Sequence, residues 1–259
     1  ARKGLAFIIM SNGMRALDEL GLGDVVRAAG RPIEHAIVRT PSGETLIGQP
    51  IGDAVCIQRS FVTDLLRQQL PHEAVVEGME FTGFDRSDDG AVEGIRFANG
   101  ATARGEIFMG ADGVRSRVRE EMYPGHCLSP VRVKELVCVV KAPMLAASLG
   151  TSFLKTVDPA GGLAVGIAPC GGEHVVWFIQ YDGERYDIHD TSPEGRREFA
   201  ETLVGHWAAP IGYLISESDF SQSYIWHTTD MEPLPTFQQD NIVLAGDAAH
   251  AFLTFTSQG

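Results

Sequence analysis

The stretch "DNIVLAGDAAHAF", residues 240–252, decides how the fold of this chain is interpreted. Its apolar run, Ile242–Ala245, is typical of a buried strand and stops abruptly at Gly246 and Asp247, before the small residues that open a helix. Gly246 permits a ligand to approach the backbone closely, and Asp247 can accept hydrogen bonds from ligand hydroxyls beside a helix N-terminus. A purely structural interpretation, in which Asp247 caps the helix and the small residues allow close packing, stays open.

A second stretch of the same design occurs earlier in the chain. In "MGADGVRSRVREEM", residues 109–122, a predicted strand over 103–108 leads into the turn at Asp112 and Gly113, and a basic helix follows. Taken alone, this turn could also be a purely structural one that the Asp112 side chain caps. The occurrence of two such turns, with a strand-rich insert between them, favours a shared ligand site.

The remaining pattern predicts an α/β chain. We expect helices over 11–20 and from Ser60 to Leu70, and another that Ser192 and Pro193 open. The expected strands are 36–40 and 45–48 as a hairpin, 80–85, 92–97 and 103–108 as a meander, then 131–141, 151–156, 163–168, 174–181 and 222–227. This order predicts a first domain over 1–128 that resumes at 229–259, with a mostly antiparallel sheet inserted at 129–228.

Composition narrows the class of ligand. The 259 residues carry a net charge of −13, which disfavours nucleic acid and anionic membranes as partners and favours a small organic molecule. No apolar run reaches the roughly 18 residues of a membrane span. The four cysteines lack metal-like spacing, so we expect reduced thiols, no metal site and a cytoplasmic protein.

The two turn sequences resemble a known family. "GADGVRSRVR" followed by "VLAGDAAHAF" and a terminal "QG" is similar to the internal flavin motifs of the FAD-dependent aromatic hydroxylases, which are single-component flavoprotein monooxygenases related to para-hydroxybenzoate hydroxylase. "MSNGMRALDELGLGD" and "IQRSFVTDLLRQQL" extend the resemblance over most of the chain. It implies an incomplete Rossmann-like FAD domain with an inserted substrate sheet. It also implies an enzyme that uses FAD, NADH or NADPH, and O2 to hydroxylate a small aromatic or other electron-rich substrate.

The resemblance also implies the roles of particular residues. Asp247 would accept hydrogen bonds from the ribityl hydroxyls of FAD. Gly246, which has no side chain, would let the cofactor approach the protein backbone closely. Arg59 would contact the phosphate or ribityl region, where a planar cation with several donors suits an anionic cofactor.

Other positions match the same two motifs. Asp112 and Gly113 would lie near the pyrophosphate and the nicotinamide donor. Gln258 and Gly259 would place backbone amides against the isoalloxazine ring.

The chain departs from the family pattern in two places. The first motif, Gly-x-Gly-x-x-Gly with its following acidic residue, is absent, and the sequence begins just beyond it. We expect either a fragment or a molecule that has those segments outside the given sequence, and poor FAD affinity for the sequence as it stands. Near the other end, Thr254 and Ser257 replace the usual proline and glycine, which puts the backbone geometry beside the flavin in question.

Strand pleating predicts where the substrate lies. Residues 174–181 alternate, so Val175, Trp177, Ile179 and Tyr181 share one face and His174, Val176, Phe178 and Gln180 the other. We expect Val176, Phe178 and Gln180 to bind the substrate, because they combine apolar surface with one orienting amide.

No catalytic side chain and no oligomeric state are predicted, and His250 is interpreted as a helix residue beside the cofactor. The alternatives are a flavoprotein oxidase or halogenase-like relative, or a catalytically impaired flavin-binding module.

Overall fold

The computed structural model describes residues 5–88 and 90–253, and the chain forms two compact units. Within the described residues, the first unit contains 5–69 together with Val131–Thr228, and the second contains 70–88, 90–130 and 229–253. Neither unit is continuous in sequence.

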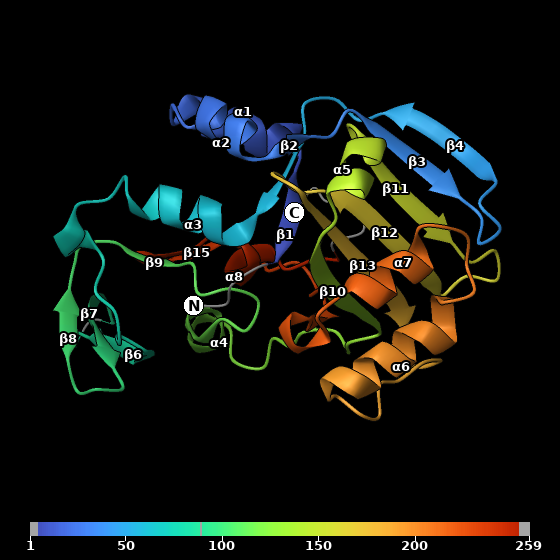
Figure 1. Cartoon of the computed structure of the whole chain (residues 1–259). Helices are drawn as coiled ribbons and strands as arrows, with labels where there is room; N and C mark the ends of the chain where they lie inside the picture. Colours follow the sequence, from blue (N-terminus) through green and yellow to red (C-terminus); the bar gives the residue numbers. More distant parts are fainter. Residues whose placement is uncertain (1–4, 89, 254–259) are drawn as a thin grey trace. The chain divides into compact units, whose positions relative to one another are not determined.

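A large sheet forms the centre of the first unit. Its strands are β3 (His35–Arg39), β4 (Thr45–Pro50), β10 (Val133–Lys141), β11 (Ser152–Val157), β12 (Leu163–Pro169), β13 (His174–Asp182) and β14 (Tyr224–Thr228). The strand order is β14-β10-β13-β12-β11-β3-β4. Figure 1 labels all of these strands except β14. Neighbours are antiparallel except β3 and β11, which run parallel. The predicted hairpin and the predicted antiparallel strands are therefore present, and the hairpin extends the sheet at the β11 edge.

Helices cover one face of this sheet (Figure 1). They are α5 (Pro143–Leu149), α6 (Pro193–Val204), α7 (Ile211–Glu217) and the short 3-10 helix η2 (Phe220–Gln222). The alternating residues of β13 that point toward them, from Val175 to Tyr181, are almost fully buried. Ser192 accepts a hydrogen bond from the backbone N–H of Gly195 and Pro193 opens α6, so the predicted start of this helix is confirmed.

A smaller sheet packs on the other face of β13. Its strands are β1 (Ala6–Ile9), β2 (Arg31–Pro32) and β5 (Val55–Gln58), with β5 in the middle, and helices α1 (Ser11–Glu19), α2 (Gly23–Ala29) and α3 (Arg59–Arg67) adjoin it. The prediction that α3 extends to Leu70 was wrong. The helix ends at Arg67, and Leu70 is 53% exposed, because Pro71 disfavours helical geometry in the residue before it.

The second unit is built around two small sheets. One is the meander β6 (Phe81–Arg86), β7 (Val92–Phe97) and β8 (Thr102–Arg104), and the other contains β9 (Phe108–Gly110), β15 (Gln238–Gln239) and β16 (Ile242–Leu244). Its helices are η1 (His72–Ala74), α4 (Arg117–Met122) and α8 (Asp247–His250).

The predicted single strand over 103–108 was wrong, because the chain turns away from the meander at Gly105. β9 pairs with β16 instead. The Asn241 side chain stabilises this departure from the meander by donating hydrogen bonds to the carbonyl oxygens of Val92 and Glu106. Within residues 5–88 and 90–253, no helix has the length and apolar character that crossing a lipid bilayer requires.

Candidate functional site

Two strand–turn–helix segments lie next to each other in the second unit. β9 leads through Asp112 and Gly113 into α4, and β16 leads through Gly246 into α8. β9 and β16 are parallel neighbours, with Leu244 opposite Gly110, so both turns leave the same edge of the sheet. Ligands of α/β sheets bind outside the carboxyl ends of parallel strands. The structure thus brings together the two turns that the sequence singled out.

Arg119 ties these two turns together. Its side chain is 4% exposed. Nη1 donates to the carbonyl oxygens of Asp247 and Ala248 at 3.2 and 3.0 Å, and Nη2 donates to that of Val114. Burial lowers the pKa of this guanidinium. The sequence analysis did not predict a role for Arg119. Its position between apolar residues of a short helix could have indicated a buried side chain.

The Asp112 carboxylate organises its own turn. It accepts hydrogen bonds from the Ser116 hydroxyl at 2.5 Å and from the backbone N–H groups of Arg117 and Val118 at 2.8 and 3.3 Å. These contacts fix the start of α4, as the capping interpretation anticipated. The next residue, Gly113, has a φ of +86° and open space where a side chain would be, so its backbone is accessible to a ligand.

The Asp247 carboxylate, in contrast, is available. The residue is exposed, and no hydrogen-bond or ion-pair partner for its side chain is found among residues 5–88 and 90–253. Gly246 before it has a φ of +58° and nothing within 4 Å of the position of an added Cβ. This combination of a free acceptor and an open backbone fits a polyhydroxylated group such as the ribityl chain of FAD. His250, at the end of α8, contacts the rings of Phe237 and Phe252.

Arg59 opens helix α3 in the first unit. Its guanidinium carbon lies 5.6 Å from the centre of the Trp226 ring, and no carboxylate partner for it is found in the part of the chain that the structure describes. An exposed guanidinium without an acidic partner can bind an anionic group. The predicted contact with FAD remains a prediction.

Val176, Phe178 and Gln180 lie on the face of the large sheet that the helices leave uncovered. Val176 packs against the smaller sheet, and the Phe178 ring stacks on that of Phe153 at 6.4 Å. A Cβ on Gly166 would lie 2.2 Å from this ring, so the glycine lets Phe178 lie against β12.

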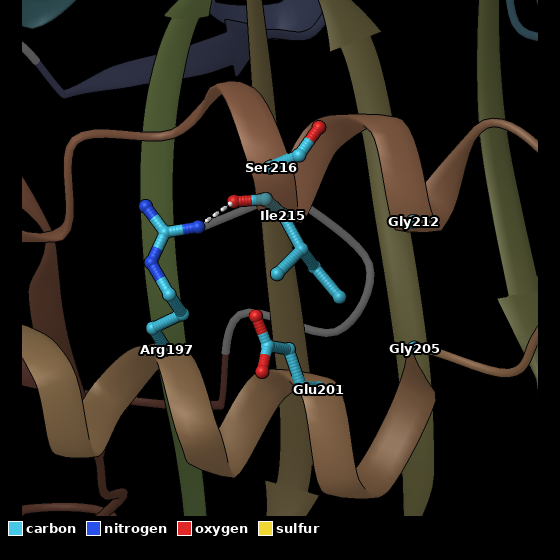
Figure 2. Close-up of a pocket in the computed structure, with 6 residues that line it drawn as sticks. All are labelled: Arg197, Glu201, Gly205, Gly212, Ile215 and Ser216. Carbon is cyan, nitrogen blue, oxygen red and sulfur yellow. Dashed lines mark hydrogen bonds between the residues drawn. The ribbon is translucent and has the colours of Figure 1, made fainter.

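A surface hollow of about 460 Å³ lies on the opposite side of this unit, between α6 and α7 (Figure 2). Arg197 lines it, and its guanidinium already donates to the carbonyl oxygens of Ile215 and Ser218. The other residues around it include Glu201, Gly205 and Gly212. None of the residues predicted from the sequence lines the hollow, so it is not part of the predicted site.

Two of the predicted cofactor contacts, Gln258 and Gly259, lie outside the described residues, as do the departures at Thr254 and Ser257. Across residues 5–88 and 90–253, no group of three or more His, Cys, Asp or Glu side chains could hold a metal ion.

Comparison with known proteins identifies the family. The FAD binding domain model matches residues 2–259. The chain belongs to this family. Among curated members, aurachin C monooxygenase/isomerase of Stigmatella aurantiaca is 29% identical, with 100% of this chain and 67% of that protein covered. The 6-hydroxynicotinate 3-monooxygenase of Pseudomonas fluorescens is 24% identical, over 100% of this chain and 69% of that protein.

Solved structures of flavin proteins share the fold. Klebsiella pneumoniae HpxO complexed with FAD and uric acid superimposes with a TM-score of 0.85 at 21% identity, covering 100% of this chain and 68% of that one. Pseudomonas aeruginosa PqsL in complex with 2-aminobenzoylacetate gives a TM-score of 0.79 at 20% identity, covering 99% and 72%.

These comparisons confirm the predicted family, the α/β fold class, the FAD cofactor and the monooxygenase class of oxidoreductase. The chain spans about two thirds of the length of the curated relatives it matches.

Proposed function

We propose that this chain forms the FAD-holding and substrate-holding part of an NADH- or NADPH-dependent monooxygenase that hydroxylates a small aromatic or other electron-rich molecule. The observation that best supports the proposal is the parallel pairing of β9 with β16, from which the turns at Gly113 and at Gly246 leave the same edge of the sheet. In such enzymes bound FAD supplies the redox chemistry, and the protein supplies binding, orientation and exclusion of water.

The residues of the second unit would hold the cofactor. Asp247 would accept hydrogen bonds from the ribityl hydroxyls, and Arg119 would keep the Asp247 backbone in place through its carbonyl contacts. Gly113 would present its backbone to the pyrophosphate, beside the turn that Asp112 stabilises. The backbone amides of Gln258 and Gly259 would lie against the isoalloxazine ring.

The residues of the first unit would bind the anionic part of the cofactor and the substrate. Arg59 would pair with phosphate oxygens. Val176, Phe178 and Gln180 would hold an aromatic ring, because this sheet face combines apolar side chains with an amide. We place the protein in the cytoplasm, because buried thiols such as Cys56 and Cys138 are free and the reduced nicotinamide is available there.

The test uses the full-length protein loaded with FAD. Oxidation of NADH and NADPH would be followed with hydroxylated benzoates, 6-hydroxynicotinate, uric acid and 2-aminobenzoylacetate, under isotopically labelled O2. We expect one of these compounds to stimulate NAD(P)H consumption and to gain one labelled oxygen atom. Consumption that yields only hydrogen peroxide with every compound would indicate an oxidase, and failure to retain FAD would overturn the proposal.

A further inference from the structure

The side chains of Arg59 and Trp226 join the two sheets of the first unit. Arg59 opens α3 directly after β5 of the smaller sheet, and Trp226 lies on β14, at the edge of the large sheet. The guanidinium carbon lies over the indole ring, 5.6 Å from its centre. A cation within about 6 Å of a ring centre is attracted by the electron-rich face of the ring. This contact therefore restricts where the guanidinium of Arg59 can lie.

The backbone of Arg59 is fixed on both sides. Its N–H donates to the carbonyl oxygen of Leu5 at 2.8 Å, which ties the start of α3 to the residue before β1. Its carbonyl oxygen accepts a hydrogen bond from the Thr63 hydroxyl at 3.0 Å, one turn further along the helix. With the backbone held in this way, the freedom that remains to Arg59 is that of its long side chain.

The ring of Trp226 is itself held in place. Trp226 lies opposite Glu135 in the pairing of β14 with β10, and it packs against the apolar cluster between the two sheets. Tyr224, two residues earlier on the same face of β14, meets the indole edge to face, with ring centres 4.8 Å apart and planes at 70°. An aromatic pair of this geometry is favourable beyond the apolar area that it buries. The indole is thus a fixed surface for the guanidinium.

The guanidinium of Arg59 keeps its hydrogen-bond donors available. Arg27, in the same unit, donates to the carboxylates of Asp18 and Asp53 at 2.7 and 2.6 Å. For the exposed Arg59 side chain, by contrast, neither a carboxylate nor a carbonyl acceptor is found in 5–88 or 90–253. A guanidinium that lies over a ring uses its flat face, while the N–H groups at its edge can still bind phosphate oxygens.

Holding the side chain before a ligand arrives has a consequence for affinity. A mobile arginine loses rotamer freedom when it binds an anion, and that loss weakens the observed affinity. An arginine that already lies over an aromatic ring has lost part of this freedom on folding. The ligand then meets a cation whose position is restricted, and it binds more tightly for the same number of hydrogen bonds.

We propose that Trp226 is a positioning residue for the cofactor: it holds the Arg59 guanidinium in place for the phosphate oxygens of FAD. This inference rests on the proposed function, in which Arg59 pairs with those oxygens. Trp226 acts through Arg59, and no covalent bond or electron transfer is involved. The contribution of the indole to FAD affinity therefore depends on the presence of the guanidinium.

The test is a titration of FAD into the full-length protein from which the flavin has been removed, followed by flavin fluorescence. Trp226→Leu should raise the Kd for FAD about two- to fivefold, the factor expected for loss of an exposed cation–π contact. Trp226→Phe should restore part of the affinity, because a benzene ring attracts a cation less strongly than indole does. His227→Leu is the matched control, since His227 is exposed and points to the other face of the same strand, and it should leave the Kd unchanged.

A double-mutant cycle separates positioning from packing. In an Arg59→Met background, Trp226→Leu should change the Kd no further, because the cation on which the indole acts is gone. A purely structural role of Trp226 would lower the urea midpoint and raise the Kd by the same factor in both backgrounds. If Trp226→Leu does not fold, Trp226→Met takes its place in the cycle, because methionine fills space without an aromatic face.

Equal Kd values for the wild type and Trp226→Leu would overturn the proposal, as would an equal factor in the two backgrounds. An Arg59→Met variant with wild-type affinity would also overturn it, since Trp226 would then have no cofactor contact to act through. Failure of the proposed function is recognised separately, because the wild-type protein itself would then fail to take up FAD or would give no labelled product in the turnover assay.

Discussion

Replacement of Arg119 by methionine should weaken both the second unit and its hold on FAD. The side chain is 4% exposed and donates to three backbone carbonyl oxygens, two of which belong to the start of α8. A hydrogen bond from a charged donor contributes about 1.5–3 kcal/mol, and removing one partner of a buried polar contact leaves the other partner unsatisfied. Because such losses within one network are not additive, we expect a decrease of about 3–5 kcal/mol in the free energy of unfolding.

The assay combines urea denaturation with measurement of FAD retained after gel filtration. Arg119→Lys should fall between the wild type and Arg119→Met, because one ammonium group cannot reproduce a planar fork of donors. Arg115→Met is the matched control, since Arg115 lies in the same turn but is exposed. Equal stability and equal FAD retention in Arg119→Met and Arg115→Met would refute the assignment of Arg119 as the tie between the two turns.

Three other substitutions test the cofactor and substrate sites. Asp247→Ala should weaken FAD binding by about 2–3 kcal/mol, measured by flavin titration, and unchanged binding at equal stability would remove Asp247 from the site. Arg59→Lys should also lower FAD affinity in the same titration, whereas a lysine variant with wild-type affinity would leave Arg59 with only its contact to Trp226. Gly166→Ala should displace the Phe178 ring and cost about 1–3 kcal/mol in urea denaturation, so an unaltered midpoint would show that the ring has another place to lie.

The sequence predicted the features that depend on local pattern. Alternation along 174–181 separated the face of β13 that packs against the helices from the face that packs against the smaller sheet, and the Ser192-Pro193 pair located the start of α6. The two glycine turns were recognised because strand, turn and helix follow each other directly in the chain. Such signals arise within a few residues and need no knowledge of distant partners.

The features that the sequence did not predict depend on distant contacts. The parallel pairing of β3 with β11 joins residues far apart in the chain, and nothing in the composition of His35–Arg39 indicates its partner. The break near Gly105 depends on Asn241, which is supplied from the other end of the chain. The role of Arg119 is likewise defined by carbonyl oxygens at Asp247 and Ala248.

The interleaved strands constrain the order in which the protein can be completed during synthesis. β3 is made early, but its neighbour β11 is made much later, after the whole of Leu70–Pro130 has emerged. β9 likewise waits for β16, which belongs to the last described stretch of the chain. Strands that wait for a distant partner expose unpaired edges, and such edges promote aggregation. A fragment that contains only residues 129–228 would keep the edge of β11 permanently bare, so expressing that stretch alone should yield an insoluble sheet.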